Sequence, residues 1–512
     1  MVFGLWFLVF GFCLKSSLDI NAKEQRRPKA KDQRPTTTDK YMNQLLVMKF
    51  GGTSVGDARC IRRAAEIVHS AARESAVVVV VSAMGGVTNR LISAAKKAAE
   101  GQDDLSTEID SLRQQHLDAA KVLSNKSALE NLIVELERIT AETASLCRGI
   151  SLLRELTPRT YATVSSVGER LSARLMAATL REVGLNSAVV ESRDVVVTDD
   201  DYLQAEPLMR EVRERSAVIL KPLLNDGVTP VVTGFIGATA DGVLTTLGRG
   251  GSDYSATTLG AALDANEIII WTDVDGVLSA DPRLVPDARL LREISYNEAA
   301  ELAYFGAKVL HPKTLRPVID ARIPVWIRNS FSPEKAGTRI TTEGHPTEHG
   351  VRAITAIPNV SMITVGGRGI VGVVGVAAKT FQAVASVRAN VLLISQSSSE
   401  NDICLIVDSV DAPQTLKALR SAFAADLKHH DVEHITVNPN IAIVAVVGEK
   451  MRGTPGIAGR TFSALGRRGI NIIAIAQGSS EYNVSFVVEA GAMRDAVAAV
   501  HDEFQLQTAS GK

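Results

Sequence analysis

Residues 45–56 read Leu-Leu-Val-Met-Lys-Phe-Gly-Gly-Thr-Ser-Val-Gly, an apolar run that ends in a glycine turn. This pattern is typical of a buried strand followed by a loop that approaches a ligand. The next residues carry Ile61, Ala64, Ala65 and Val68 at helical spacing, which predicts a helix with one apolar face. The segment therefore predicts the start of an α/β domain whose first loop belongs to a binding site.

The same pattern recurs along the chain. Residues 77–81 are five valines followed by a second glycine turn at 82–86, and such a run suits a strand that is buried on both faces. Alternating strands and helices favour a mostly parallel sheet within a domain at 43–340. Further strands are expected at 188–191, 230–233, 268–272 and 324–327, and helices at 96–155 and 169–182.

Length and composition exclude several classes of protein. A chain of 512 residues suggests about three or four domains. Its 46% hydrophobic residues and net charge of −1 exclude disorder over most of the chain and disfavour a nucleic-acid partner. The four cysteines form no CxxC motif, so we expect neither a zinc site nor a disulfide framework; they are Cys13, Cys60, Cys147 and Cys404.

Residues 1–42 form an N-terminal extension outside the predicted fold. Residues 1–14 are nearly all apolar but fall short of the ~20 needed to cross a bilayer, and no positive charge precedes them. A disordered or targeting segment and a start site truly at Met42 both remain open. No other stretch is apolar enough to span a membrane, so we expect a cytoplasmic protein with no membrane partner.

The last third of the chain contains a repeat. Residues 380–407 and 461–488 lie 81 positions apart and are identical at 10 of 28 positions. Each copy, with the apolar run before it, predicts a β-α-β-β unit of the ferredoxin-like kind. We therefore expect two small domains, at 355–435 and 436–505, that pack on each other. In each copy an Asn is expected to begin the second strand and a Gln to end it. These amides either form turns and caps or bind the polar groups of an amino acid. The residues are Asn390, Gln396, Asn471 and Gln477.

A second glycine loop, Thr-Thr-Leu-Gly-Arg-Gly-Gly-Ser-Asp-Tyr-Ser-Ala, spans residues 245–256. Ser252 is predicted to cap the following helix, and Asp253 would lie in its first turn, where a carboxylate complements the helix dipole. Arg249 stands among glycines with little to pack on, which favours an anion as its partner.

Two further segments carry residues suited to a nucleotide. Residues 272–276 (Thr-Asp-Val-Asp-Gly) and 281–283 (Asp-Pro-Arg) are either plain turn formers or the edge of a nucleotide site. Residues 307–312 read Ala-Lys-Val-Leu-His-Pro, in which Lys308 is the favoured nucleotide contact and His311 is expected to be structural.

Taken in order, these motifs resemble those of the aspartokinases. The resemblance rests on KFGGTSVG at 49–56, VGERLSA at 167–173, GRGGSDYSA at 248–256, TDVDG at 272–276, DPR at 281–283 and AKVLHP at 307–312. It implies an α/β amino-acid kinase fold, and the repeated tail resembles the paired ACT domains that bind end-product amino acids. The tail is most similar to that of aspartokinases fused to homoserine dehydrogenase, but no GxGxxG unit follows it, so we expect a monofunctional kinase.

The resemblance implies an aspartate kinase (ATP:L-aspartate 4-phosphotransferase), which makes 4-phospho-L-aspartate with ATP and Mg²⁺. It assigns catalysis to Lys49 and Asp253, the phosphate cradle to Gly51, Gly52 and Thr53, and substrate binding to Thr88, Glu169, Arg249, Gly250 and Ser252. ATP would be held by Thr272, Asp273, Arg283 and Lys308, and the effector by Asn390, Gln396, Asn471 and Gln477. Leu278 stands where the family often has a tyrosine near the adenine.

The resemblance further implies the first step of lysine, threonine and methionine biosynthesis, under feedback control with threonine favoured over lysine. It also implies a homodimer or a larger assembly. Two alternatives stay open: a non-catalytic amino-acid sensor with the same fold, and a kinase for another carboxylate such as glutamate, since one methylene discriminates weakly.

Overall fold

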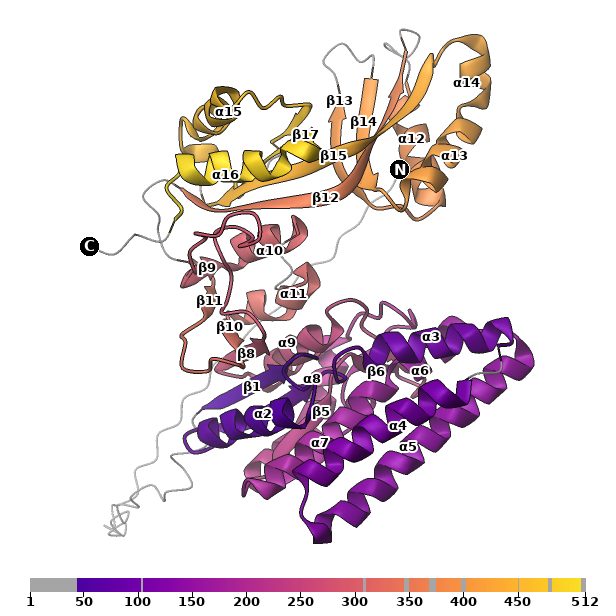
Figure 1. Cartoon of the computed structure of the whole chain (residues 1–512), viewed down its shortest axis with the longest axis vertical. Coiled ribbons are helices and arrows are strands. Elements are labelled where there is room, and N and C mark those ends of the chain that lie inside the picture. Colours follow the sequence, from indigo (N-terminus) through magenta and orange to yellow (C-terminus); the bar gives the residue numbers. More distant parts are fainter. Residues whose placement is uncertain are drawn as a thin grey trace, which may run out of the picture. The chain divides into compact units, whose positions relative to one another are not determined.

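The computed structural model shows two bodies of regular structure: a larger part that carries the predicted catalytic residues Lys49 and Asp253, called the catalytic part below, and a smaller C-terminal part (Figure 1). The predicted N-terminal extension, residues 1–42, and Lys308 lie outside the described residues. The structure describes residues 44–102, 105–306, 310–344, 350–367, 374–396, 402–449, 451–477 and 481–507.

The catalytic part is built on an eight-stranded sheet with the order β3-β5-β2-β1-β8-β10-β11-β9. Neighbouring strands are parallel except for β10 and β11, so the prediction of a mostly parallel sheet is confirmed. The strands are β1 (Leu45–Phe50), β2 (Ala76–Val81), β3 (Ser187–Val190), β5 (Thr229–Thr233), β8 (Glu267–Thr272), β9 (Glu293–Ser295), β10 (Val325–Asn329) and β11 (Thr338–Thr341).

Helices cover both faces of this sheet. The valines of β2 alternate between two cores: Val77, Val79 and Val81 face residues of α2 to α7, and Val78 and Val80 face residues of α8 to α11. A strand buried on both faces needs no polar alternation, which explains the run of five valines. The helices are α2 (Ala58–Ala71), α3 (Val87–Glu100), α4 (Leu105–Leu123), α5 (Lys126–Leu153), α6 (Pro158–Ser165), α7 (Val167–Glu182), α8 (Met209–Asn225), α9 (Gly251–Leu263), α10 (Tyr296–Tyr304) and α11 (Pro312–Ala321).

A small three-stranded sheet, β4-β6-β7, was not predicted from the sequence. Its strands are β4 (Val197–Thr198), β6 (Ile236–Thr239) and β7 (Leu244–Thr246). Strands of two to four residues are too short for their apolar alternation to stand out. This sheet matters for function because the second glycine loop follows directly from β7.

The C-terminal part is one six-stranded antiparallel sheet with the order β13-β14-β12-β15-β17-β16. Its two central strands are long enough to run through both repeats. The elements are β12 (Val351–Gly366), α12 (Val376–Ser386), β13 (Val391–Gln396), β14 (Asp402–Asp408), α13 (Ala412–Ala422), α14 (Ala424–His429), β15 (His434–Gly448), α15 (Ile457–Arg467), β16 (Ala474–Ala476), β17 (Asn483–Glu489) and α16 (Met493–Glu503).

The two repeats share strands in this sheet. The second half of β12 pairs with the first half of β15, and the first half of β12 pairs with the second half of β15. The second module therefore takes its outer strand, residues 351–357, from chain that precedes the first module. The register shifts where the two halves of β12 meet, next to Asn359 with its positive φ of 59°.

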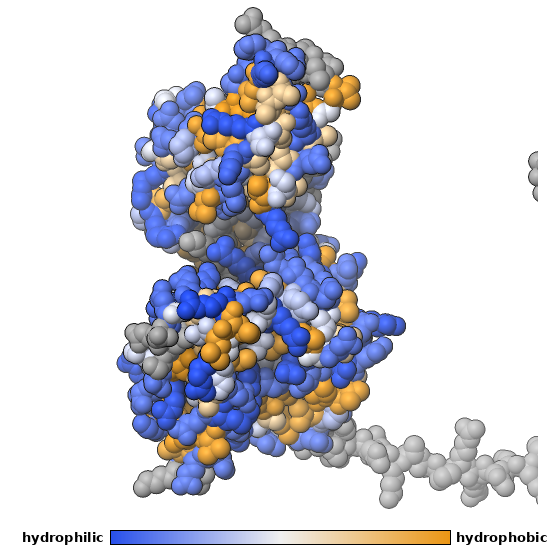
Figure 2. Space-filling model, turned by 90° about the vertical axis from the view of Figure 1, so that its right-hand side faces the viewer, coloured by the Kyte–Doolittle hydropathy of each residue, from blue (hydrophilic) through white to orange (hydrophobic). Residues whose placement is uncertain are grey.

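Apolar side chains are exposed at several places on the long helices of the catalytic part. Figure 2 shows that hydrophobic residues on one face of the protein are interrupted by hydrophilic ones. Among the described residues, no helix combines the length and the hydropathy that a bilayer crossing requires. Examples of these exposed apolar side chains among the described residues are Val122, Val134, Leu152, Leu153 and Val218.

Helix α10 connects the catalytic part to the C-terminal sheet. The Arg352 Nε donates to Glu298 Oε1 over 2.7 Å, and the side chains of this ion pair are 7% and 0% exposed. Glu298 Oε2 also accepts from the Ser295 N–H at 2.8 Å and so closes a capping box at the start of α10. Asn297 donates to the Tyr482 hydroxyl at the same contact.

We expect Arg352→Met to lower the free energy of unfolding by about 3–5 kcal/mol, because it leaves the Glu298 carboxylate buried without its partner. Urea denaturation followed by circular dichroism measures the loss. The control is Arg468→Met, which removes a half-exposed ion pair with Asp502 and should cost under ~1 kcal/mol. Equal losses in the two variants would contradict this account of α10.

Candidate active site

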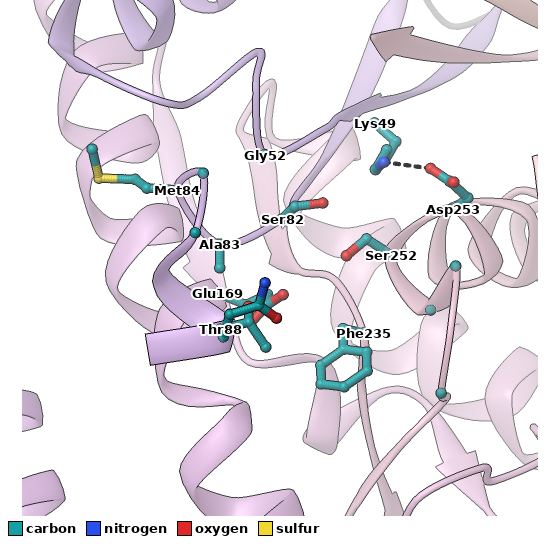
Figure 3. A pocket seen from close by; sticks show the side chains of 16 residues that line it. Lys49, Gly52, Ser82, Ala83, Met84, Thr88, Glu169, Phe235, Ser252 and Asp253 are labelled. Atoms are coloured by element: carbon teal, nitrogen blue, oxygen red, sulfur yellow. Dashed lines mark ion pairs between the residues drawn. The ribbon is translucent and has the colours of Figure 1, made fainter. Parts of the chain in front are cut away.

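A pocket of about 330 Å³ lies at the carboxyl ends of the central parallel strands. Ligands of open α/β sheets bind at this edge, because loops from several strands meet there. Figure 3 shows side chains from β1, α3, α7 and α9 around one hollow. The lining includes seven predicted site residues: Lys49, Gly52, Thr88, Glu169, Gly250, Ser252 and Asp253.

Lys49 and Asp253 form an ion pair at the wall of this pocket (Figure 3). Lys49 lies near the end of β1 and is 8% exposed, and Asp253 lies in the first turn of α9. The pair places Lys49 Nζ at the pocket wall, where an incoming anion could compete with Asp253 for it.

The glycine turns allow the backbone to line the pocket closely. A Cβ atom on Gly52 would lie 3.1 Å from the Ala83 carbonyl oxygen in the next turn. Gly250 has a φ of +72°, and a Cβ there would lie 2.7 Å from the His311 Cβ. A side chain at Gly52 would be tightly packed against this backbone, and Gly250 requires glycine both for space and for its backbone conformation.

Helix α9 begins two residues earlier than predicted. Its N-cap is Gly250, with no side-chain hydrogen bond, and Ser252 lies inside the first turn, so the prediction of Ser252 as the cap is wrong. The left-handed conformation of Gly250 starts the helix, whereas a serine cap needs an extended backbone. Without a capping side chain, the first N–H groups and the positive end of the helix dipole can serve a bound anion.

Glu169 supplies a buried carboxyl group to the pocket from the first turn of α7. It is 4% exposed, and its Oε2 has no hydrogen-bond partner within the described structure. Burial raises the pKa of Glu169 to about 8, although the Ala83 N–H and the charge of Lys49 act in the opposite direction. The carboxyl is therefore mostly neutral at pH 7, and a ligand with a positive charge would favour its ionisation.

Phe235 is a pocket residue that the sequence analysis missed. Its φ of +69° is unusual for an aromatic residue, and its N–H donates to Ser255 Oγ at 2.9 Å. Its ring lies against α9, since a Cβ on Gly251 would come within 2.6 Å of it. Figure 3 shows the ring across the hollow from Thr88 and Glu169. The glycine before it, Gly234, was the only sequence signal.

Three predicted residues lie beside the pocket but do not line it. The Gly51 N–H donates to the Trp271 carbonyl at 3.0 Å, which ties the first turn to β8. Thr53 is exposed. Arg249 is exposed between Gly248 and Gly250, which both line the pocket.

The predicted nucleotide edge adjoins the first glycine turn. The Ser330 hydroxyl bonds to Ser54 Oγ at 2.8 Å and to the Thr272 carbonyl at 3.1 Å. Asp273 is exposed at the end of the same strand. Arg283, also exposed, is held by Asp281, with 2.5 Å between Nη2 and Oδ2.

Only part of the predicted motif at residues 307–312 (AKVLHP) lies within the described residues. Lys308 lies outside the described residues. His311 caps α11, because its Nδ1 accepts from the Lys313 N–H at 3.3 Å. This is the structural role that the sequence predicted for it.

The four predicted effector residues are all exposed. Asn390 directly precedes β13, and Gln396 is its last residue. Asn471 lies three residues before β16, so the prediction that it begins that strand is wrong; Gln477 follows the strand directly. The second repeat departs from extended geometry here, which its sequence similarity to the first repeat did not reveal.

Comparison with protein families and curated proteins agrees with this architecture. Residues 44–329 match the amino acid kinase family, and residues 363–423 and 444–504 each match the ACT domain. The chain is 38% identical to a chloroplastic bifunctional aspartokinase/homoserine dehydrogenase of Daucus carota, covering 90% of the chain and 50% of that protein. It is 35% identical to the chloroplastic aspartokinase 1 of Arabidopsis thaliana, covering 90% of the chain and 80% of that protein.

Solved structures give the same result. The structure of E. coli aspartokinase III in complex with aspartate and ADP has a TM-score of 0.76 and 32% identity, covering 90% of this chain and 99% of that one. The same enzyme with lysine and aspartate has a TM-score of 0.73 at 32% identity, with the same coverage. The chain spans about half the length of the bifunctional relatives it matches. The expected fold is confirmed, and the chain belongs to the amino acid kinase family and, within it, to the aspartokinases.

Proposed function

We propose that the chain transfers the γ-phosphoryl group of ATP to the side-chain carboxylate of L-aspartate and so forms 4-phospho-L-aspartate. The observation that carries this proposal is the pocket itself, in which a buried lysine, two glycine turns and a buried carboxyl group meet. The E. coli aspartokinase III complex with aspartate and ADP supports the choice of both substrates. A non-catalytic sensor would have no need for a buried Lys49–Asp253 pair.

The chemistry requires positioning and charge rather than a base. An aspartate side chain is already ionised at pH 7, so no proton has to be removed from the nucleophile. The obstacle is the repulsion between this carboxylate and the ATP phosphates. Lys49 would neutralise the phosphoryl group in transfer, and Gly52 and Thr53 would add N–H donors. Gly51 holds the turn through its hydrogen bond to the Trp271 carbonyl.

The remaining pocket residues would orient the amino acid. Glu169 would accept from the α-ammonium group, for which its free Oε2 is suited. Arg249 would swing from solvent to the α-carboxylate, and Thr88 and Ser252 would help from the two helix termini. Asp253 would keep Lys49 in place until substrate arrives and would receive it again after product leaves.

ATP would lie over the adjoining strand end, held by Thr272, Asp273, Arg283 and Lys308. Arg283 would have to exchange Asp281 for a phosphate, a move that costs little because the pair is exposed. Leu278 bridges to Leu290 through the backbone and offers an aliphatic side chain to an adenine.

Magnesium is expected to arrive with ATP. Among the described residues, no three His, Cys, Asp or Glu side chains lie together in a way that could hold a metal ion. Mg²⁺ in phosphoryl transfer needs only one or two carboxylates besides phosphates and water, so Asp253 at the pocket wall fits it. When bound, the ion would supply further charge neutralisation on the phosphates.

Regulation follows from the paired ACT modules. We assign the chain to the first step of lysine, threonine and methionine biosynthesis, with an amino-acid effector near Asn390, Gln396, Asn471 and Gln477. We favour threonine as the effector because several relatives are aspartokinases fused to homoserine dehydrogenase, the group whose tail this chain resembles most. The solved complex with lysine is that of E. coli aspartokinase III. A cytoplasmic homodimer or larger assembly remains part of the proposal.

A hydroxamate assay with aspartate, glutamate and N-acetylglutamate tests the reaction, because hydroxylamine traps an acyl phosphate. We expect product with aspartate, and a kcat about 100- to 1,000-fold lower for Lys49→Met, since one charge contact is lost in a dry site. The control is Lys379→Met, which breaks an ion pair with Asp426 in the first ACT module. Formation of the hydroxamate from glutamate but not from aspartate would reject the proposal. Normal turnover by a folded Lys49→Met variant would also reject it.

We expect the KM for aspartate to fall as the pH rises toward 8 and then to level off. Only ionised Glu169 can pair with the ammonium group, and its pKa is about 8, so affinity should change by about tenfold per pH unit below that value. Steady-state kinetics between pH 6 and 9 measures this. A wild-type KM for aspartate that is flat over this range would contradict the role of Glu169.

The same group predicts a pH-dependent stability. The folded-state pKa of Glu169 lies above the unfolded value of 4.5, so its contribution to stability is present below pH 4.5 and is lost as the pH rises through 8. Glu169→Gln should therefore raise the melting temperature relative to the wild type at pH 9 but not at pH 5. Its KM for aspartate should be high and independent of pH.

We expect threonine to inhibit the purified chain and lysine to leave it active. Inhibition arises if the effector binds a less active arrangement more tightly. Initial rates measured at increasing concentrations of each amino acid decide the matter. Inhibition by lysine without inhibition by threonine would show that the choice of effector is wrong.

A further inference from the structure

The segment that follows the predicted nucleotide edge is packed into the second ACT module. Ala280 and Val285 belong to the same hydrophobic core as Phe486, Phe504 and Leu506. The Ala288 backbone also forms an antiparallel bridge with Gln507. A loop of the catalytic part is therefore covered by the C-terminal helix α16 and the residues that follow it.

Ser279 is the polar centre of this contact. Its hydroxyl oxygen lies 2.9 Å from His501 Nε2 on α16 and 3.1 Å from the Leu506 carbonyl oxygen, and the Arg289 N–H donates to it at 2.9 Å. Its carbonyl accepts from the Ile354 N–H at 2.8 Å. Ser279 and His501 are both 0% exposed.

The donors and acceptors at Ser279 determine the state of His501. A serine hydroxyl has one hydrogen, and the Leu506 carbonyl can only accept, so the hydroxyl donates there. His501 Nε2 must then carry the proton that is shared with Ser279. The other nitrogen, Nδ1, is buried without a partner in the described structure, as an unprotonated nitrogen can be. Burial lowers the pKa of His501, which agrees with a neutral ring.

The opposite end of the same loop is anchored in the catalytic sheet. Asp275 receives the Asn329 amide at 2.7 Å and Lys335 Nζ at 2.6 Å. The Val277 N–H donates to Thr338 Oγ1 at 2.8 Å. Hydrogen bonds therefore hold the loop at both ends, to the catalytic sheet at one end and to α16 at the other. Two of the four predicted nucleotide residues, Asp273 and Arg283, flank these contacts.

We propose that Ser279 and His501 are positioning residues for the nucleotide, so that the second ACT module is a structural part of the ATP site. This inference rests on the proposed function, since it takes the loop at 272–283 to hold ATP. The hydrogen bond between Ser279 and His501 fixes the end of the loop that lies against α16, and Arg283 follows four residues later. Neither residue contacts the nucleotide itself.

The experiment compares Ser279→Ala, His501→Leu and the double variant in the full chain. We expect the Kd for ADP, from isothermal titration calorimetry, and the KM for ATP to rise about tenfold in each single variant, as for one hydrogen bond lost. The double variant should equal Ser279→Ala, because that variant already removes the hydrogen bond to His501 together with those to the Leu506 carbonyl and the Arg289 N–H. The KM for aspartate should change by less than about twofold. His501→Gln, whose amide can reach Ser279, should recover most of the affinity for ADP.

The matched control is His116→Leu, which replaces another fully buried histidine that bonds only within α4, to the Leu112 carbonyl. This variant should lose stability but bind ADP as the wild type does. Wild-type affinity for ADP in folded Ser279→Ala and His501→Leu would overturn the inference. An equal loss of affinity in His116→Leu would do the same, because the effect would then be general instability.

Hydrogen exchange gives a readout that does not depend on turnover. Because coupling is reciprocal, ADP should slow amide exchange in peptides that cover α16 of the wild type, and it should not do so in Ser279→Ala. Unchanged exchange in α16 on ADP binding would contradict the inference. A wild-type chain that binds ADP with these effects but does not phosphorylate aspartate would instead contradict the proposed function alone.

Discussion

The repulsion between two anions is the constraint on which the rest of this structure depends. A site that joins a carboxylate to a phosphoryl group must bring a fixed positive charge out of water and keep it there. In the proposed reaction Lys49 would meet that need at the end of β1, where it pairs with Asp253 at the start of α9. The parallel sheet then places both residues at one edge, where the glycine turns add backbone donors.

The same constraint accounts for the strained features around the pocket. Gly250 needs a positive φ and the space next to His311, and Phe235 adopts a positive φ as it packs against α9. Such backbone conformations persist only where surrounding contacts impose them, and they gather at functional sites. The uncapped first turn of α9 is a cost of the same kind, which a bound phosphate would offset.

Regulation by the ACT modules would depend on the buried contacts that join them to the catalytic part. Two segments of the catalytic part contact the C-terminal part through buried groups: α10 through Glu298 and Arg352, and the loop after β8 through Ser279 and His501. Both contacts are buried, so a shift in the sheet cannot leave the catalytic part unaffected. A small rearrangement of the ACT modules would reach the nucleotide edge without any long chain of intermediates.

Much of the fold was predictable because its signals are local. The run from Val77 to Val81 and the face of α2 with Ile61 and Val68 carry their burial pattern in the sequence itself, and both lie as predicted. Seven predicted site residues line one pocket because the end of β1, the start of α3 after β2, the first turn of α7 and the start of α9 meet there. What could not be predicted depends on distant contacts.

Ser252 looks like a helix cap until the conformation of Gly250 is known. Phe235 carries no motif, and its place comes from Gly234 and Gly251 on two different elements. The first half of β12 joins the second module rather than the first, since its pairing partner lies about ninety residues further along the chain.

The most direct measurement is a crystal structure of the chain with aspartate and a non-hydrolysable MgATP analogue. The account predicts that Lys49 Nζ leaves Asp253 and contacts both the γ-phosphoryl group and the aspartate carboxylate. A ternary complex in which Lys49 remains paired with Asp253 and the phosphates lie elsewhere would contradict it.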